Sequence, residues 1–335
     1  MIHSIDLPLI WAAIIGVGVF MYVLLDGFDL GIGLLFPLSG NEAERDQMLA
    51  TIKPYWDGNE TWLVLGGAGL LVAFPRAYSI IMPAFYLPII AMLLALIFRG
   101  VAFEFRGAAH NKQGWNFAFT VGSILAGFFQ GVVLGGLIQG IRVVNGAFAG
   151  SALDWLTPFA VLCGLGVVAG YGLLGATWLT MKATGEVARR AREQASWLLI
   201  LVLVFMAAVS VWTPLAFPRI AERWFSLPNF YFLWPVPTVT GILALGCWLA
   251  LKSGKDVLPF LCAMGLFLLG YAGLVISVFP YLVPPSLTIW ETAASPASQT
   301  FMLAGTIVLL PVILGYTAFI YWLFRGKVRE GEGYH

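Results

Sequence analysis

Residues 21–30 read MYVLLDGFDL, and residues 56–62 read WDGNETW. Each stretch places two carboxylates within or at the start of a long apolar run. An ionised acid in hydrocarbon costs at least ~2.5–3.5 kcal/mol, so a chain seldom keeps four of them without a use. The usual uses are a proton path, an ion site, or a polar contact with a partner helix. The four acids are Asp26, Asp29, Asp57 and Glu60.

The composition is that of an integral membrane protein surrounded by lipid. Hydrophobic residues make up 60% of the chain and charged residues 10%, and the mean hydropathy is +0.89. A soluble protein carries about 25% charged residues. The net charge of +1 and the lack of a basic stripe argue against nucleic acid as a partner. Three scattered cysteines, Cys163, Cys247 and Cys262, lack the spacing of metal ligands.

Hydropathy predicts an all-α protein with nine transmembrane helices in a single transmembrane domain, residues 1–335. The rule used is that a bilayer core needs about 20 apolar residues per helix. Gly27, Gly31 and Gly33 in the long first span would allow close helix contacts. The predicted spans lie near 8–36, 56–75, 79–99, 117–141, 156–180, 197–215, 235–251, 257–279 and 301–324.

The distribution of lysine and arginine predicts how the spans are oriented. With the N-terminus in the periplasm, the cytoplasmic segments hold most of the 18 Lys and Arg residues. Cytoplasmic loops are enriched in these residues, so the C-terminus is predicted to be cytoplasmic. The segments on the periplasmic side hold only Arg76, Arg142, Arg219 and Arg223.

This orientation gathers acids from three consecutive helices on the cytoplasmic side. Such a cluster can pass protons between neighbouring sites, and intramembrane acids are functional by default. The alternative is structural, with Arg99 and Arg106 neutralising some of the acids and locking the helices together. Both interpretations stay open at this point. The acids concerned are Asp26, Asp29, Asp57, Glu60 and Glu104.

The histidines bear on cofactor chemistry, because haem in a membrane bundle needs axial His, Met or Cys ligands. The chain has three histidines, and His3, His110 and His335 all lie outside the predicted spans. A bis-His haem and a multi-His metal site within the bundle are therefore excluded, whereas Met ligands stay open. Trp62 follows Glu60 by two residues, where a tryptophan either lines a cavity or simply packs.

Four sequence blocks together resemble one family. Residues 25–33 (LDGFDLGIG) and 56–63 (WDGNETWL) are similar to the two N-terminal signatures of subunit II of cytochrome bd-type quinol oxidases. Residues 98–106 (FRGVAFEFR) and 279–291 (FPYLVPPSLTIWE) match further blocks. The resemblance covers essentially the whole chain, and it includes the branch called cyanide-insensitive oxidase.

The resemblance implies a haem-free subunit of an electrogenic, non-pumping complex that oxidises quinol and reduces oxygen to water in the bacterial inner membrane. Its partner, subunit I, would carry two b haems and one d haem and form a pseudosymmetric heterodimer with this chain. Each large subunit would consist of two four-helix bundles plus one peripheral helix. A small single-helix subunit often joins the pair. Some relatives hold a structural quinone in this subunit, which the sequence leaves open.

The resemblance also implies residue roles. Asp57 matches an acid implicated in proton delivery from the cytoplasm toward haem d, and Glu104 matches an acidic position near the start of that path. Many relatives carry Asp at the second position, and some carry Lys where this chain has Ala108 and Ala109. Trp62 matches a position near a lateral oxygen route. The remaining candidates are Asp26, Asp29 and Glu60 for the proton path, and Arg99, Arg106, Trp56 and Asn59 for structural polar or subunit contacts.

Two other classes of function fit parts of the pattern. A proton-coupled secondary transporter would also use intramembrane acids and helices interrupted by glycine. Against it, the DGFD motif has no convincing inverted repeat in the second half of the chain. The third interpretation is a purely structural partner whose acids serve only as contacts at the interface.

Overall fold

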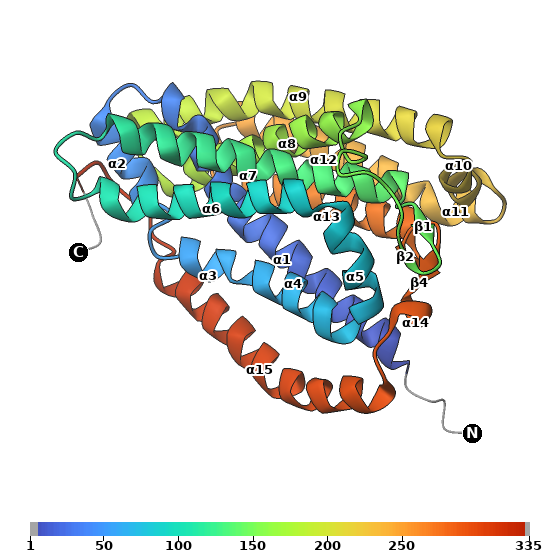
Figure 1. Cartoon of the computed structure of the whole chain (residues 1–335). Coiled ribbons are helices and arrows are strands. Elements are labelled where there is room, and N and C mark those ends of the chain that lie inside the picture. The colour runs from blue at the N-terminus through green and yellow to red at the C-terminus, as the bar shows by residue number, and fades with distance from the viewer. Residues whose placement is uncertain (1–5, 332–335) are drawn as a thin grey trace.

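The computed structural model of the chain describes residues 6–331 and is built almost entirely from helices (Figure 1). Two short antiparallel hairpins complete it, β1 (Val143–Val144) with β2 (Ala147–Phe148), and β3 (Tyr281–Val283) with β4 (Leu287–Thr288). The α-helices are α1 (Leu7–Leu35), α2 (Glu42–Ala50), α3 (Trp56–Glu60), α4 (Trp62–Ala73), α5 (Pro75–Ala84), α6 (Tyr86–Arg106), α7 (Gln113–Gln139), α8 (Pro158–Lys182), α9 (Gly185–Ala216), α10 (Pro218–Phe225), α11 (Asn229–Leu233), α12 (Pro235–Lys252), α13 (Leu258–Val278), α14 (Ile289–Thr292) and α15 (Pro296–Leu323).

Within residues 6–331, eight helical segments are long and apolar enough to cross a membrane, which confirms an all-α membrane protein. The sequence predicted nine, and that count is not reached. The stretch predicted as the second span, 56–75, is divided into α3, with five residues, and α4, with twelve. Thr61 joins them, and there the N–H of Val64 donates at 3.0 Å to the carbonyl of Thr61, three residues back, in a tighter turn than that of a regular α-helix.

The third predicted span, 79–99, is displaced along the chain. The helix begins at Tyr86 and continues to Arg106, so Arg99 lies inside α6 instead of at its end. Both Arg99 and Arg106 are buried, with 1% and 2% of their surface exposed. Carboxylates pair with both guanidinium groups, which allows the helix to continue where hydropathy alone predicts an end.

Helix α1 runs through the middle of the molecule and packs against α4, α7 and α8 (Figure 1). Its closest approach to α8 is made by two glycines, as the glycine-rich first span suggested. A Cβ atom added to Gly31 would lie 1.8 Å from the carbonyl oxygen of Tyr171, and one added to Gly175 would lie 2.5 Å from the carbonyl carbon of Gly31. Only glycine lets the two backbones touch at this crossing.

The largest part of the hydrophobic core lies around α1 and α8, and it is rich in aromatic rings. Phe28 stacks on Trp178 with their ring centroids 4.0 Å apart, and Phe260 from α13 meets both rings edge-on. Tyr55 and Tyr321 close the same group, and their rings stack at 4.5 Å. This packing ties the segment before α3 and the end of α15 to the centre of the bundle.

Helix α15 is the least buried of the apolar helices. No residue of its most apolar 18-residue window is buried within the chain, and in Figure 1 it bows away from α3 and α4. Its first turns are held by Gln299. The side-chain amide of Gln299 donates to the carbonyl of Ala73 at 3.2 Å, and its backbone carbonyl accepts from the indole N–H of Trp11 at 3.1 Å. Its other end is held by a C-terminal segment, so α15 is attached mainly at its two ends.

The C-terminal segment, residues 324–329, crosses the end of α8. The ammonium group of Lys182 donates to the carbonyls of Phe324 and Gly326, and the N–H of Val328 donates to the carbonyl of Lys182 at 2.7 Å. The amide of Gln47 adds a bond to the carbonyl of Val328 at 2.9 Å. These contacts fasten the end of α15 to α2 and α8.

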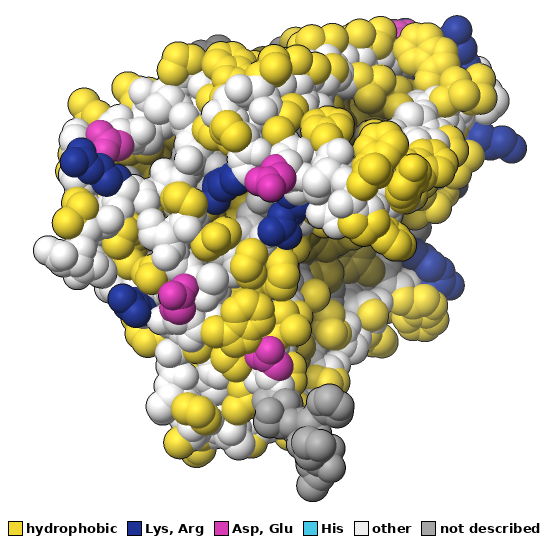
Figure 2. All heavy atoms as spheres, turned by 90° about the vertical axis from the view of Figure 1, so that its right-hand side faces the viewer, with side chains coloured by type: hydrophobic (Ala, Val, Ile, Leu, Met, Phe, Trp, Pro, Cys, Tyr) yellow, Lys and Arg dark blue, Asp and Glu magenta, His cyan; other side chains and the backbone are white. Residues whose placement is uncertain are grey.

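The two ends of the molecule differ in charge. Figure 2 shows the end at which α10, α11 and the hairpins lie in Figure 1, and there hydrophobic and uncharged surface prevails over a few scattered charged side chains. The opposite end carries α2 and the loops that hold most of the ion pairs, such as those of Arg189 and Arg192. The orientation rule counts Lys and Arg alone, so the predicted orientation stays a prediction.

Candidate functional site

Five residues form a buried charge cluster inside the bundle: Asp26 and Asp29 of α1, Asn59 and Glu60 of α3, and Arg99 of α6. Asp26 and Asp29 are 0% exposed. Nη1 of Arg99 lies 2.7 Å from Oδ1 of Asp26 and 3.8 Å from Oε2 of Glu60. Nη2 of Arg99 lies 3.9 Å from Oδ2 of Asp29. One cation from α6 thus serves acids from two other helices.

The cluster holds three carboxyl groups and one guanidinium. Full ionisation would leave it with excess negative charge in a site where little solvent can screen it. The side chain of Glu60 is 29% exposed, so this end of the cluster reaches the surface of the chain. An arrangement of this kind can accept a proton on one carboxyl while the Arg99–Asp26 pair stays intact.

Asn59 supplies the neutral hydrogen bonds of the cluster. Its Nδ2 donates to Oδ2 of Asp29 at 2.8 Å and to the carbonyl of Leu25 at 3.3 Å. Its Oδ1 accepts from the hydroxyl of Tyr321 at 2.9 Å. The carboxamide therefore links the acid on α1 to the end of α15.

A second set of polar side chains lies around Tyr22, which is one turn before Asp26 on α1. The hydroxyl of Tyr171 on α8 donates to Oε1 of Gln130 on α7, and Nε2 of Gln130 donates to the hydroxyl of Tyr22 at 2.7 Å. Tyr22 and Tyr171 are 3% and 2% exposed. Three helices thus share buried hydrogen bonds next to the charge cluster.

Of the other candidate residues from the sequence, Asp57 lies near enough to Glu60 for its charge to act on that carboxyl group. Asp57 and Glu104 are exposed on the surface of this chain, on α3 and α6. Trp62 is 3% exposed at the start of α4. Trp56 packs on α6, with its ring 5.1 Å from that of Phe103. The structure thus brings together Asp26, Asp29, Glu60, Asn59 and Arg99, whereas Asp57 and Glu104 stay outside this group.

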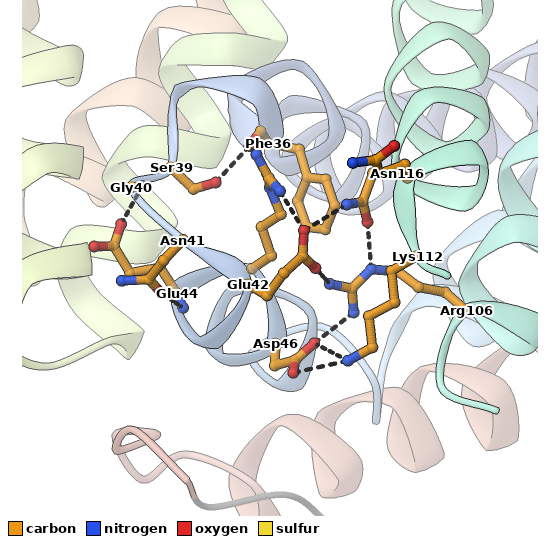
Figure 3. Close-up of polar contacts among 12 residues, drawn as sticks. Phe36, Ser39, Gly40, Asn41, Glu42, Glu44, Asp46, Arg106, Lys112 and Asn116 are labelled. Carbon is orange, nitrogen blue, oxygen red and sulfur yellow. Dashed lines mark hydrogen bonds and ion pairs between the residues drawn. The ribbon is translucent and has the colours of Figure 1, made fainter. Parts of the chain in front are cut away.

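Arg106 belongs to a different set of contacts, drawn in Figure 3, at the end of α6. Its guanidinium pairs with Asp46 and, at 2.7 Å, with Glu42, both on α2. Asn116 accepts from Arg106 and donates to Glu42 at 2.8 Å, and Lys112 pairs with Asp46 at 3.1 Å. We call these five residues the α2–α6 ion cluster. It fastens α2 to the ends of α6 and α7.

The ion cluster lowers the pKa values of its two acids. Burial alone would raise the pKa of Asp46, but hydrogen bonds and charge from Arg106 and Lys112 outweigh it and hold the pKa below its usual range. For Glu42 burial again acts upward, and hydrogen bonds from Arg45 and Asn116 lower its pKa. Both carboxylates are therefore ionised partners and poor proton acceptors at neutral pH.

Sequence reasoning missed several of these residues. It grouped Arg106 with the intramembrane acids, whereas the partners of Arg106 are Glu42 and Asp46 in the connecting segment. The spacing of Asn41 and Glu44, which cap α2 with a bond of 2.9 Å, is a local signal for that helix. Tyr321 carries no such signal, because it meets Asn59 across 262 positions of sequence.

The described residues hold no cluster of side chains of the kind that binds a metal ion. Between residues 6 and 331 there is no group of three or more His, Cys, Asp or Glu side chains that could hold a metal ion. His110 lies in a loop, and the three cysteines are free and buried, with Cys247 near Cys262. His3 and His335 lie outside the described residues. We therefore derive no chemical step through a cofactor held by this chain.

Comparisons with known proteins agree with one another. Residues 7–324 match the family "Cytochrome bd terminal oxidase subunit II". The chain is 29% identical to cytochrome bd-I ubiquinol oxidase subunit 2 of Escherichia coli (strain K12), covering 97% of this chain and 96% of that protein. It is also 29% identical to cytochrome bd ubiquinol oxidase subunit 2 of Bacillus subtilis (strain 168), covering 98% and 97%.

A solved structure shares the fold. The chain superimposes on a chain of the bd oxidase from Geobacillus thermodenitrificans with a TM-score of 0.72, covering 95% of this chain and 99% of that one at 17% identity. The family match spans nearly all of the described residues, and the eight apolar helices agree with it. The chain therefore belongs to the family of cytochrome bd terminal oxidase subunit II, multi-pass proteins of the bacterial inner membrane.

Proposed function

We propose that this chain is the haem-free subunit II of a cytochrome bd-type quinol:oxygen oxidoreductase. The observation that carries the proposal is the family match over residues 7–324, supported by relatives described as subunit 2 of ubiquinol oxidases. In such a complex the b and d haems belong to subunit I, and this chain stabilises that partner. The family assignment does not favour the proton-coupled secondary transporter.

The proposed architecture is one transmembrane domain, residues 1–335, with nine spans, the N-terminus in the periplasm and the C-terminus in the cytoplasm. Helices α3 and α4 together would form the second span in chain order and bring the count from eight to nine. They cover residues 56–73 with one residue between them. Helix α15 would be the peripheral helix beside two four-helix bundles. Its unburied apolar window supports that role.

The proposed contribution to chemistry is proton delivery from the cytoplasm. Asp57 and Glu104 are exposed on this chain, and a carboxylate at membrane depth needs a partner protein or water around it. Subunit I would cover this surface and receive protons there. Asp26, Asp29 and Glu60, deeper in this chain, would be further proton-accepting groups of the path. Uptake from the cytoplasm with quinol oxidation outside would build a membrane potential without pumping.

An oxygen route and further partners complete the proposed function. Trp62 is buried at the start of α4, close in sequence to Glu60, and would border a lateral oxygen route toward subunit I. A small single-helix subunit and a structural quinone are partners that the family allows. Trp56, Asn59, Arg99 and Arg106 would act in holding this region together.

The substitution Asp57→Asn tests the proton path in the assembled oxidase. It removes the ionisable group from an exposed position, so the fold should survive. We expect quinol oxidase turnover to fall at least roughly tenfold, as for loss of a proton-transfer group. Oxygen consumption with excess quinol measures turnover, and the visible spectrum of the purified complex measures haem content, which should stay normal.

The matched control is Asp154→Asn, which changes an exposed acid in the loop between β2 and α8. That variant should keep its turnover. Normal turnover in Asp57→Asn with a full haem complement would remove Asp57 from the proton path. Loss of haem d in Asp57→Asn would instead assign it to assembly.

A further inference from the structure

Tyr321 lies in the last turn of α15 and reaches the buried charge cluster from there. Its hydroxyl donates to Oδ1 of Asn59 at 2.9 Å, and Nδ2 of Asn59 donates to Oδ2 of Asp29 at 2.8 Å. Asn59 is 2% exposed, so water has little access to its carboxamide. A tyrosine of α15 and an acid of α1 are thus joined through one amide.

The chemistry of a carboxamide makes this geometry directional. An asparagine presents an acceptor on one side and two N–H donors on the other, and a half-turn about its last bond exchanges them. Asp29 needs a donor when it is ionised. Because the hydroxyl of Tyr321 occupies the oxygen of Asn59, the NH₂ group is directed to Asp29 and to the carbonyl of Leu25, which it reaches at 3.3 Å.

The ring of Tyr321 is itself held in place. It stacks on Tyr55 with centroids 4.5 Å apart and meets Trp178 edge-on at 6.2 Å. The hydroxyl of Tyr55 donates at 2.7 Å to the carbonyl of Phe324, which Lys182 also binds. The end of α15 is thereby fixed from both sides, and the Tyr321 hydroxyl is presented to Asn59 in a defined position.

We propose that Tyr321 is a positioning residue for Asp29. By holding the Asn59 carboxamide in one orientation, it keeps an N–H donor on the Asp29 carboxylate and thereby sets how readily the buried charge cluster takes up a proton. The effect on turnover rests on the proposed function, whereas the effect on Asp29 does not.

Other groups around Asp29 act on the same proton. Arg99 approaches from α6 at 3.9 Å, Glu60 is on α3, and Asp26 shares α1 with Asp29. Tyr22 of α1 and Tyr171 of α8 lie on the Asp26 side of the cluster and complete the titratable neighbours. Tyr321→Phe changes none of these charged groups, so its effect reports on the orientation of Asn59.

The test uses the complete oxidase with Tyr321→Phe and follows the carboxylic acid C=O band in the infrared as pH is varied. The band that disappears in Asp29→Asn identifies Asp29. Without the hydroxyl, Oδ1 of Asn59 loses its hydrogen-bond donor and the carboxamide is free to turn. The ionised Asp29 carboxylate then accepts a hydrogen bond from Asn59 for only part of the time. We expect the midpoint of the Asp29 band to rise by about 0.5–1 pH unit.

The matched control is Tyr316→Phe, because Tyr316 lies on the same helix with 64% of its surface exposed. That variant should leave the midpoint unchanged. Replacing Tyr321 by 3-fluorotyrosine keeps the ring and strengthens the donor, so the midpoint should move down or stay, but not rise. An unshifted midpoint in Tyr321→Phe, or a rise with 3-fluorotyrosine, would overturn the proposal.

A double variant separates positioning from general damage. In an Asn59→Ala background the amide is absent, so Tyr321→Phe should add no further shift. An equal additional shift there would show that Tyr321 acts by another route and would also overturn the proposal. If Asp57→Asn keeps full turnover while the Asp29 band still shifts in Tyr321→Phe, the proton-path function fails and the positioning role stands.

Discussion

At the scale of the residue, ion pairs decide where polar side chains lie within an apolar protein. Asp26 and Asp29 are three positions apart, a spacing that puts both on one face of a helix. The sequence did not distinguish which arginine would serve them. Arg99 takes that place and Arg106 pairs with α2 instead, a difference that depends on α6 continuing past Arg99.

The α2–α6 ion cluster predicts a pH dependence of stability. The folded pKa of Asp46 is lowered, so its stabilising contribution is fully present above the unfolded pKa of about 3.9 and is lost as pH falls through the folded value. In Asp46→Asn that contribution is absent. We expect a melting temperature roughly 1–3 °C below that of the natural protein at pH 7.

The difference in melting temperature between the two proteins should shrink as the pH falls below about 4. Differential scanning fluorimetry of the detergent-solubilised complex across this range measures it. Glu222→Gln, at an exposed acid of α10, is the control and should match the natural protein at each pH. A difference that grows toward acid pH would contradict the ionised role of Asp46.

At the scale of the element, hydropathy predicts which segments are membrane helices, because burial in lipid requires long apolar runs. It fails where a helix is interrupted, as at Thr61, since one tight turn of backbone hydrogen bonding leaves no trace in an average over twenty residues. It also misses how α15 is fastened, because the bonds of Lys182 and Gln299 join segments far apart in sequence.

The C-terminal segment predicts the effect of removing one cation. Lys182→Met would delete the donors to the carbonyls of Phe324 and Gly326 while keeping the length and apolar character of the side chain. Each hydrogen bond contributes about 1 kcal/mol, so the segment should open more often. We expect trypsin to cleave after Arg325 and Lys327 roughly tenfold faster than in the natural protein.

Lys252→Met provides the comparison, because Lys252 is an exposed lysine at the end of α12 that contacts Trp248 and not the C-terminal segment. Its cleavage rate at the C-terminus should equal that of the natural protein. Mass spectrometry of the released peptides identifies the sites. Equal rates for Lys182→Met and the natural protein would show that the segment is held by other contacts.

At the scale of the whole molecule, the distribution of Lys and Arg predicts the orientation of the spans, and that orientation stays a prediction. The rule counts the Lys and Arg residues of each loop, and loops can be recognised in the sequence as the segments between apolar runs. What the count does not yield is the packing of the spans, because the crossing at Gly31 and Gly175 depends on two backbones that approach only after folding. Hydropathy predicted the all-α membrane class, which the eight apolar helices confirm, whereas the arrangement in two bundles came from the family resemblance and stays a prediction.

The orientation is open to a direct measurement, because the three native cysteines are buried and should react little. Ala108→Cys and Ala152→Cys place exposed thiols in loops at the two ends of the molecule. A membrane-impermeant maleimide added to intact spheroplasts should label Ala152→Cys and leave Ala108→Cys unlabelled. After permeabilisation both should react.

The natural protein, treated in parallel, gives the background from the native cysteines. Labelling of Ala108→Cys alone in intact spheroplasts would reverse the proposed orientation. It would also move the buried charge cluster to the periplasmic half of the membrane.

The bowed course of α15 has a consequence for biogenesis. Helix α15 is held at both ends, and the apolar side chains along its middle are not covered by this chain. Phospholipid tails must solvate these side chains until the newly made polypeptide assembles with its partner subunit. Wherever the partner subunit comes to pack against this helix, those tails must leave. Formation of the holoenzyme is in this sense a solvent exchange, and its rate should respond to the thickness and fluidity of the bilayer in which it takes place.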